Sequence, residues 1–257
     1  MDYMATEIVD IDRMPRGGPG ASCIDRLLQT DRLEYLDRED VDESKKRSVI
    51  RALEWTGEAF GQNEKFARIA LDEVADVPDP RILELGAGHG ALSRKLLEWH
   101  PTAQVTVTDV ELPSVRAMAG GELGDHPRAT VREMDATAID VADRHFDLAV
   151  FVLAFHHLRP SLASEVIAEG TRVADKLLII DLPRPPWPLH LLRLATMLPL
   201  APWIPMVHDG VISSLRTYSP SALRALAAHA DPSIDIELRG GLISAQVAVA
   251  SRTPQSV

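Results

Sequence analysis

A short apolar run that leads into three closely spaced glycines constrains the fold of this chain more than any other feature. The run covers residues 82–85, and Gly86, Gly88 and Gly90 follow it in the sequence ILELGAGHG. Because glycine lacks a Cβ, the backbone can turn sharply there and approach a ligand closely. Where a strand ends and a helix begins, the first N–H groups of the helix can donate to that ligand. The pattern predicts a strand, a turn and a helix that together hold a nucleotide-like ligand.

Short apolar runs alternate with helical patterns on both sides of this turn. The predicted strands are residues 81–85, 104–109, 130–134, 147–153 and 176–181, and the predicted helices between them are residues 90–99, 112–119 and 161–173. Two later runs, residues 234–238 and 242–251, predict a terminal hairpin around Gly240 and Gly241. Such alternation builds right-handed strand-helix-strand units around a mostly parallel sheet with helices on both faces. We therefore expect a doubly wound α/β fold.

The chain divides into three expected parts. Residues 1–22 contain closely spaced prolines and glycines, which predict a mobile N-terminal segment. Residues 23–78 show apolar side chains at three- and four-residue steps, which predict a helical N-terminal extension. Residues 79–257 form the expected α/β domain, and a proline-rich apolar insertion at about residues 183–218 interrupts it.

Composition excludes several classes of function. The net charge of −11 gives a surface that repels phosphate backbones, so we expect no nucleic-acid partner. Cys23 is the single cysteine, which fits a reducing compartment. The N-terminus carries acids rather than the basic region of a secretory signal, and prolines break the one long apolar stretch, residues 186–207. We expect a cytoplasmic protein without a transmembrane segment.

Two acidic residues near the glycines indicate the kind of ligand. Glu84 should lie beside the ligand, where it would repel a pyrophosphate and attract a cation such as the sulfonium of S-adenosylmethionine. Asp109 ends the second predicted strand, at the spacing where an acid binds ribose hydroxyls in doubly wound folds. Asp135 follows the third strand and either accepts from an adenine amino group or is an ordinary turn aspartate. The glycines alone also fit a dinucleotide fingerprint, so a nicotinamide cofactor is the alternative.

Four motifs in order, ILELGAGHG, VTVTDVE, MDAT and FDLAVFVLAFHHL, resemble the class I S-adenosylmethionine-dependent methyltransferases. They are especially similar to the group that includes the ubiquinone and menaquinone biosynthesis methyltransferases, over roughly residues 80–182. The resemblance implies a Rossmann-like, seven-stranded sheet whose last strand is antiparallel, with S-adenosylmethionine as cofactor. The cofactor-binding residues that it implies are Glu84, Gly86, Ala87, Gly88, Asp109, Val110, Asp135, Ala136 and Leu153.

Methyl transfer to a hydroxyl needs an aligned acceptor and a base, and histidine is the usual base at neutral pH. His156 and His157 follow the fourth strand at the expected cofactor edge, and a packing or capping role is their alternative. His208 is a third candidate, because the adjacent Asp209 could orient its imidazole; the alternative is a polar turn. Two residues do not make a metal site, so we assign no metal ligands. The expected acceptor contacts are His208, Asp209, Arg216 and Tyr218.

The insertion at residues 183–218 is rich in leucine, methionine and tryptophan. Insertions after late strands can cover the ligand crevice, so this one predicts a lid over a largely apolar or aromatic small-molecule acceptor. A homodimer interface or a membrane-surface contact are the alternatives. We expect O-methylation first and C-methylation next. A nicotinamide-dependent oxidoreductase and a catalytically inactive cofactor-binding domain are the competing functions.

Overall fold

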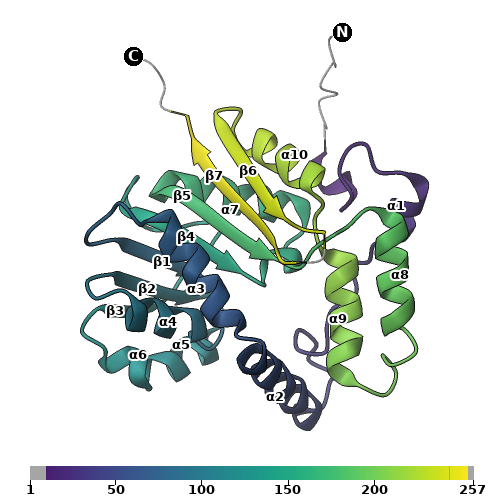
Figure 1. The fold of residues 1–257 in the computed structure, drawn as a ribbon, viewed down its shortest axis with the longest axis horizontal. Helices are drawn as coiled ribbons and strands as arrows, with labels where there is room; N and C mark the ends of the chain where they lie inside the picture. The colour runs from purple at the N-terminus through teal and green to yellow at the C-terminus, as the bar shows by residue number, and fades with distance from the viewer. Residues whose placement is uncertain (1–9, 243, 254–257) are drawn as a thin grey trace.

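The computed structural model describes residues 10–242 and 244–253, and these residues form a seven-stranded sheet of order β3-β2-β1-β4-β5-β7-β6 (Figure 1). Strand β7 is antiparallel to both of its neighbours, β5 and β6, and the other neighbouring strands are parallel. This confirms the predicted doubly wound fold with an antiparallel last strand. The strands are β1 (Arg81–Leu85), β2 (Gln104–Asp109), β3 (Ala129–Glu133), β4 (Phe146–Val152), β5 (Ala174–Asp181), β6 (Ile234–Gly240) and β7 (Gln246–Arg252).

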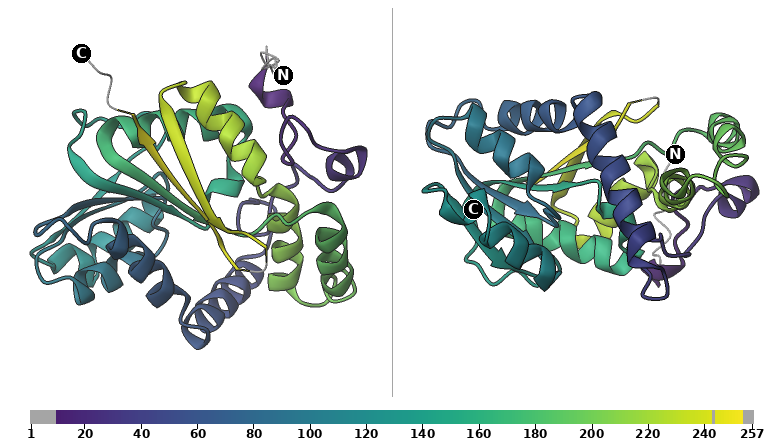
Figure 2. Two further views of the ribbon diagram at one scale, coloured as in Figure 1. Left: turned by 45° about the horizontal axis from the view of Figure 1, so that its top comes forward. Right: turned by 90° about the horizontal axis from the view of Figure 1, so that it is seen from below.

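Helices cover both faces of the sheet (Figures 1 and 2). One face carries α3 (Gln62–Glu73), α4 (Ala91–Trp99), α5 (Leu112–Ala119) and α6 (Glu122–Asp125), and the other carries α7 (Pro160–Val173) and α10 (Pro220–Ala230). Side chains alternate between the faces along each strand. On β1, Leu83 and Leu85 enter the core under α7 and α10, whereas Ile82 enters the core under α3 and α4. Glu84 shares the face of Ile82.

The proline-rich insertion forms two helices, α8 (Trp187–Met197) and α9 (Pro205–Arg216), which lie side by side at one end of the molecule (Figure 2). Pro188 lies in the first turn of α8 and Pro205 begins α9, where a missing N–H costs no helical hydrogen bond. Helix α9 also contacts α2 (Glu43–Ala59) from the N-terminal extension. Among the described residues, no helix is both long enough and apolar enough to cross a membrane.

The structure adds two details to the expected N-terminal part. Residues 10–22 pack against the body: Ile11 and Met14 are buried, and Arg16 donates to the carbonyl of Leu158 at 2.8 Å. These contacts concern only part of the predicted mobile segment, because residues 1–9 lie outside the described residues. The extension is also not continuously helical, because residues 28–42 form an irregular segment between α1 (Cys23–Leu27) and α2.

Candidate functional site

The glycine turn connects β1 to α4, as the sequence predicts. Gly86, Gly88 and Gly90 have φ angles of 62°, 57° and 69°, in the left-handed region that side chains rarely adopt. A Cβ on Gly86 would lie 2.7 Å from the ring of Phe151, so this glycine is needed for packing. A Cβ on Gly88 would meet nothing within 4 Å. The backbone of Gly88 therefore faces open space that a ligand can enter.

Asp109, at the end of β2, supports this turn directly. Its Oδ2 accepts from the Gly88 N–H at 2.7 Å, and its Oδ1 accepts from the Glu111 N–H at 2.8 Å. Each carboxylate oxygen has a second lone pair, so Asp109 can also accept hydroxyl groups of a ribose. The same carboxylate accepts the Gly88 N–H, so this N–H is not free to bind a pyrophosphate.

Glu84 does not lie where we expected it. Its side chain is buried on the α4 side of the sheet, and its carboxyl oxygen accepts the Ser93 hydroxyl of α4. Burial raises the pKa of Glu84 to about 7, although the Ser93 hydrogen bond lowers it. The alternation of side chains along β1 turns this carboxyl towards α4. Glu84 therefore does not place its charge beside a ligand at the glycine turn, as we had expected.

The other predicted cofactor residues follow the carboxyl ends of the strands. Val110 is 60% exposed after β2. Asp135 is exposed after β3, beside the half-buried Ala136, and its Oδ1 accepts from the Thr137 N–H at 2.8 Å. Leu153, after β4, has a φ of 53°, a strained conformation of the kind found at functional sites. Because β1 to β4 are parallel, these positions share one edge of the sheet with the glycine turn.

The Ala87 N–H donates to the Thr108 carbonyl at 2.8 Å, which ties the glycine turn to β2 as well. Ala87 itself is half-buried. Its backbone thus fixes the turn in position next to the end of the second strand.

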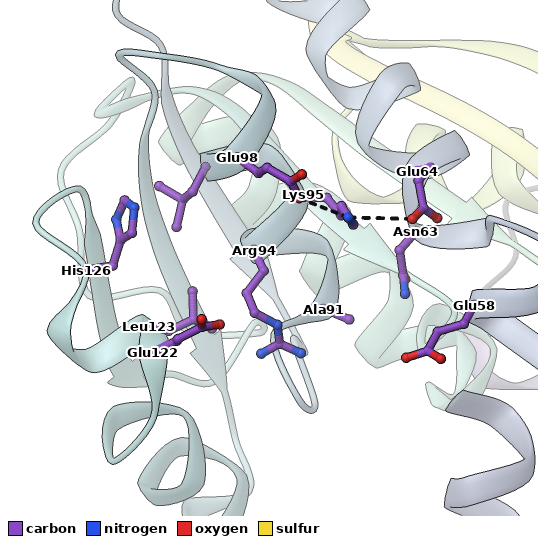
Figure 3. Close-up of a pocket in the computed structure, with 11 residues that line it drawn as sticks. Glu58, Asn63, Glu64, Ala91, Arg94, Lys95, Glu98, Glu122, Leu123 and His126 are labelled. Carbon is purple, nitrogen blue, oxygen red and sulfur yellow. Dashed lines mark hydrogen bonds and ion pairs between the residues drawn. The ribbon is translucent and has the colours of Figure 1, made fainter. Parts of the chain in front are cut away.

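Three cavities lie near these elements. One of about 680 Å³ lies between α3, α4 and α6, with Arg94 pointing into it, and its walls contain none of the predicted site residues (Figure 3). A second, of about 450 Å³, reaches the glycine turn at Gly88. A third, of about 430 Å³, includes Leu153. The predicted cofactor residues thus border two separate cavities, and Asp109 lines neither of them.

His156 is buried between two carboxylates. Its Nδ1 donates to Asp181 Oδ1 at 2.7 Å, and its Nε2 lies 3.4 Å from Glu34 Oε1. Burial lowers the pKa of His156, but Asp181 and Glu34 outweigh burial and raise it to about 9. With both nitrogens facing carboxylates, His156 is not a free general base, which corrects the prediction.

His157 is more open, because its side chain is 30% exposed. Its Nδ1 lies 3.0 Å from Asp37 Oδ2, and its Nε2 lies 3.9 Å from Glu34 Oε1. Asp181, Glu34 and Asp37 surround the two histidines, and none of these three acids was predicted as a site residue. Asp181 ends the apolar strand β5 just as Asp109 ends β2, so an acid at a strand end was the sequence signal that could have identified Asp181. Glu34 and Asp37 lie in the irregular segment, where no pattern marks them.

His208 and Asp209 form a pair, with 2.9 Å between His208 Nδ1 and Asp209 Oδ1. The His208 ring stacks on Tyr35 at a centroid distance of 3.9 Å, and the buried Asp209 accepts from the Tyr35 N–H at 2.9 Å. Burial raises the pKa of the Asp209 carboxyl. His208 borders a separate cavity of about 470 Å³ beside Arg32 and Arg38. The structure therefore does not bring His208 into the cavity at Leu153.

Arg216 and Tyr218 are structural rather than open to an acceptor. Arg216 is buried and donates to the His157 carbonyl at 2.6 Å. The Tyr218 hydroxyl donates to the Leu158 carbonyl at 2.7 Å, and burial raises the pKa of Tyr218. Together with Arg16, these side chains hold the backbone of the turn that carries the two histidines. The predicted contacts with the acceptor are thus replaced by contacts within the protein.

Comparison with known proteins agrees with this architecture. Residues 82–176 match the model of a methyltransferase domain. The chain is 31% identical over 136 residues to the malonyl-[acyl-carrier protein] O-methyltransferase of Geobacter sulfurreducens, a match that spans 52% of this chain and only 50% of that protein.

Two solved structures share the fold at low identity. The plantazolicin methyltransferase BamL, solved with a triazolic desmethylPZN analog and SAH, has a TM-score of 0.62 at 11% identity, over 84% of this chain and 91% of that chain. The [4+2]-cyclase SpnF has a TM-score of 0.52 at 17% identity, over 69% of this chain and 59% of that chain. The match to a methyltransferase domain thus covers residues 82–176, and the likeness to these two solved structures shows a shared fold.

Proposed function

We propose that this protein binds S-adenosylmethionine at the carboxyl edge of its sheet and transfers the methyl group to a small molecule. The observation that carries the proposal is the open backbone of Gly88, held by Asp109 from the adjacent strand. Residues 86–88 would border the methionine part of the cofactor, Asp109 the ribose, and Asp135 with Ala136 the adenine. When bound, the cofactor supplies a methyl group on a positively charged sulfur.

The nicotinamide alternative fits these residues less well. A dinucleotide site needs loop N–H groups that are free to bind the pyrophosphate. Here Asp109 Oδ2 accepts the Gly88 N–H at 2.7 Å and places a negative charge beside the turn. A carboxylate at the end of the second strand serves both kinds of cofactor, so its charge does not distinguish them. The occupied Gly88 N–H, rather than Glu84, is the observation that favours S-adenosylmethionine.

The cavity at Leu153 is the best candidate for the acceptor. It lies where β4 and β5 end, beneath the start of α8, and most of its wall is apolar. Gln62 and Arg193 add polar groups to this wall. These features favour a small, largely apolar or aromatic acceptor with one polar end. The Geobacter relative is named an O-methyltransferase, which favours oxygen as the acceptor atom, with carbon next. The apolar wall consists of Phe66, Leu153, Leu182, Pro183, Pro185, Leu189, Leu242 and Ala245.

Calorimetric titration with S-adenosylmethionine and its demethylated product tests the cofactor. We expect Asp109→Ala to weaken binding at least tenfold, because a hydrogen bond to a charged group is worth roughly 1.5–3 kcal/mol. Asp147→Ala is the matched control. Asp147 lies near the start of β4, at the opposite end of the parallel strands from the glycine turn, and it accepts the Arg81 N–H at 2.7 Å. The proposal fails if the native protein binds neither compound, or if it binds NADH instead.

A labelled-methyl assay with a cell extract tests the acceptor cavity. Leu189 lines the cavity, whereas Leu192 on the same helix is 62% exposed. We expect Leu189→Asp to lower product formation about tenfold, because a charge in an apolar wall opposes binding of an apolar molecule. Leu192→Asp should leave it unchanged. Equal effects of the two variants would place the acceptor elsewhere.

A further inference from the structure

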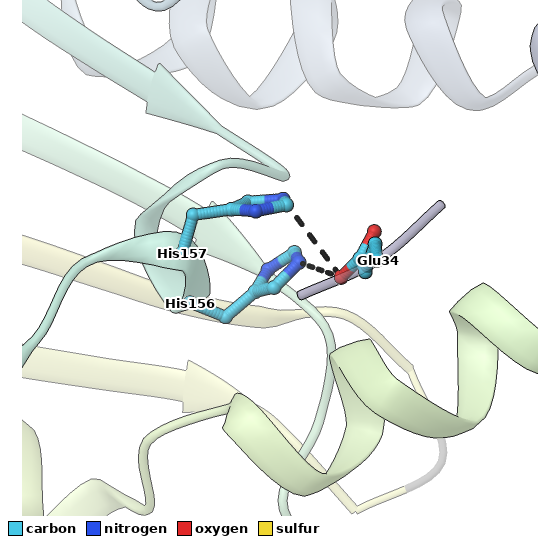
Figure 4. A group of neighbouring side chains, drawn as sticks. All are labelled: Glu34, His156 and His157. Atoms are coloured by element: carbon cyan, nitrogen blue, oxygen red, sulfur yellow. Dashed lines mark ion pairs between the residues drawn. The ribbon is translucent and has the colours of Figure 1, made fainter. Parts of the chain in front are cut away.

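We propose that Glu34, His156 and His157 bind one divalent transition-metal ion, with Zn²⁺ as the best-fitting ion. The three side chains come from two distant segments, the irregular stretch before α2 and the turn after β4. They converge on one point (Figure 4). The proposal concerns metal binding alone and does not depend on methyl transfer.

The distances between the ligand atoms suit one ion. Glu34 Oε1 lies 3.4 Å from His156 Nε2 and 3.9 Å from His157 Nε2, and one potential ligand atom from each residue lies within 4.8 Å of the other two. Zinc bonds to nitrogen and oxygen are about 2.0–2.2 Å long, so neighbouring ligand atoms around one ion lie roughly 3–3.6 Å apart. The Glu34–His156 distance already falls in this range, and the Glu34–His157 distance exceeds it by a few tenths of an ångström.

The outer partners of the histidines are those of a metal site. His156 Nδ1 pairs with Asp181 Oδ1 at 2.7 Å, and His157 Nδ1 pairs with Asp37 Oδ2 at 3.0 Å. A carboxylate that accepts the Nδ1–H fixes the imidazole with its Nε2 lone pair facing inward, which is the usual support of a metal-binding histidine. Both inward nitrogens then face Glu34 Oε1, where one metal ion can take the place of a shared proton.

The ligand carboxylate is also held in position. The Ser213 hydroxyl, from α9, donates to Glu34 Oε1 at 2.7 Å. Glu34 and His156 are buried, at 6% and 3% exposure. Rigid, buried ligands with satisfied outer hydrogen bonds bind metal with little loss of side-chain freedom.

The composition of the site indicates the type of ion. Two imidazoles and one carboxylate suit Zn²⁺ and neighbouring transition metals, whereas Mg²⁺ and Ca²⁺ prefer oxygen ligands. Three protein ligands leave a fourth position open, as in zinc sites that bind a water or a substrate. The partly exposed side chain of His157 gives an ion access from solvent.

The experiment uses the full chain without a histidine tag, treated with chelator and then titrated with Co²⁺ and Zn²⁺. We expect one equivalent of Zn²⁺ by calorimetry and the visible absorption bands of four- or five-coordinate Co²⁺. His157→Ala should weaken Zn²⁺ binding at least a hundredfold. Asp37→Asn should weaken it about 10- to 100-fold, which is the usual effect of removing an outer partner.

His229→Ala is the matched control, because His229 is an exposed histidine on α10 and should not affect binding. Circular dichroism checks that each variant is folded, and Glu34→Gln replaces any variant that is not. The proposal is overturned if the native protein shows no Co²⁺ bands, or if His157→Ala binds Zn²⁺ as tightly as His229→Ala does. Such a result would identify the three residues as an ion-pair cluster.

Discussion

The glycine turn and the histidine cluster lie at the same edge of the sheet, but they are built differently. The turn consists of consecutive residues, 86–90, and one acid from the next strand, Asp109. The cluster joins Glu34 and Asp37 from the irregular segment, the two histidines after β4, Asp181 at the end of β5 and a serine of α9. A site made of neighbouring residues is visible in a sequence, whereas a site assembled from distant segments is not.

The two regions also depend on different interactions. In the turn, backbone conformation matters most, because positive φ angles and close packing require glycine. In the cluster, buried charges matter most, because His156 lies between two buried carboxylates that would lose their shared imidazole partner if it were removed. Substitutions in the turn should therefore act through backbone strain and packing, whereas substitutions in the cluster should act through buried charges that lose a partner.

The largest effect is expected from His156→Ala in metal-free buffer. The variant leaves Asp181 and Glu34 buried without their shared partner, which should cost about 3–5 kcal/mol in the free energy of unfolding. His157→Ala should cost less than about 1 kcal/mol, because His157 and Asp37 are both about a third exposed. Urea unfolding measures both values. Equal losses would mean that burial of charge does not distinguish the two histidines.

A pair of glycine variants tests the turn. Gly86→Ala should lose about 3 kcal/mol, since a left-handed conformation costs roughly 1–2 kcal/mol and contact with Phe151 adds more. Gly88→Ala should lose only about 1 kcal/mol, because its Cβ would enter open space. That Cβ would nevertheless narrow the space for the cofactor, so binding of S-adenosylmethionine should weaken. If Gly88→Ala binds normally, the ligand does not approach the backbone there.

Glu84 predicts a smaller, pH-dependent effect. Its pKa is raised from 4.5 to about 7 in the folded protein, so between these values the folded state holds a proton that the unfolded state has released. The free energy of unfolding should therefore fall by about 2.5 kcal/mol from this group as pH rises from 5 to 8.

Glu84→Gln should lack this decline, and urea unfolding at both pH values measures the difference between the two proteins. All other ionisable groups are the same in the two proteins, so their contribution cancels in that difference. Identical pH dependence would show that the carboxyl ionises in the folded protein at its ordinary pKa.

Most of the fold could be predicted from the sequence, while half of the site could not. Periodicity located β1, α4 and the terminal hairpin to within a few residues, whereas the strand order came from the structure. The role of Glu84 was mistaken because strand alternation turns it towards α4. Arg216 and Tyr218 were predicted to contact the acceptor, but they bind backbone carbonyls instead. Polar residues near a crevice can hold a backbone turn as readily as they bind a ligand.

By itself, the sequence determined the parallel sheet, the glycine turn and the acid at the end of the second strand, because each depends on local patterns of residues. Only the tertiary structure placed Glu34 and Asp37 against His156 and His157, because these contacts cross more than a hundred residues and an irregular segment. Tertiary structure also decided which side of the sheet Glu84 faces and which cavity the insertion covers. The physical reason is that local propensities set the elements, whereas packing of distant segments sets which charges are buried together.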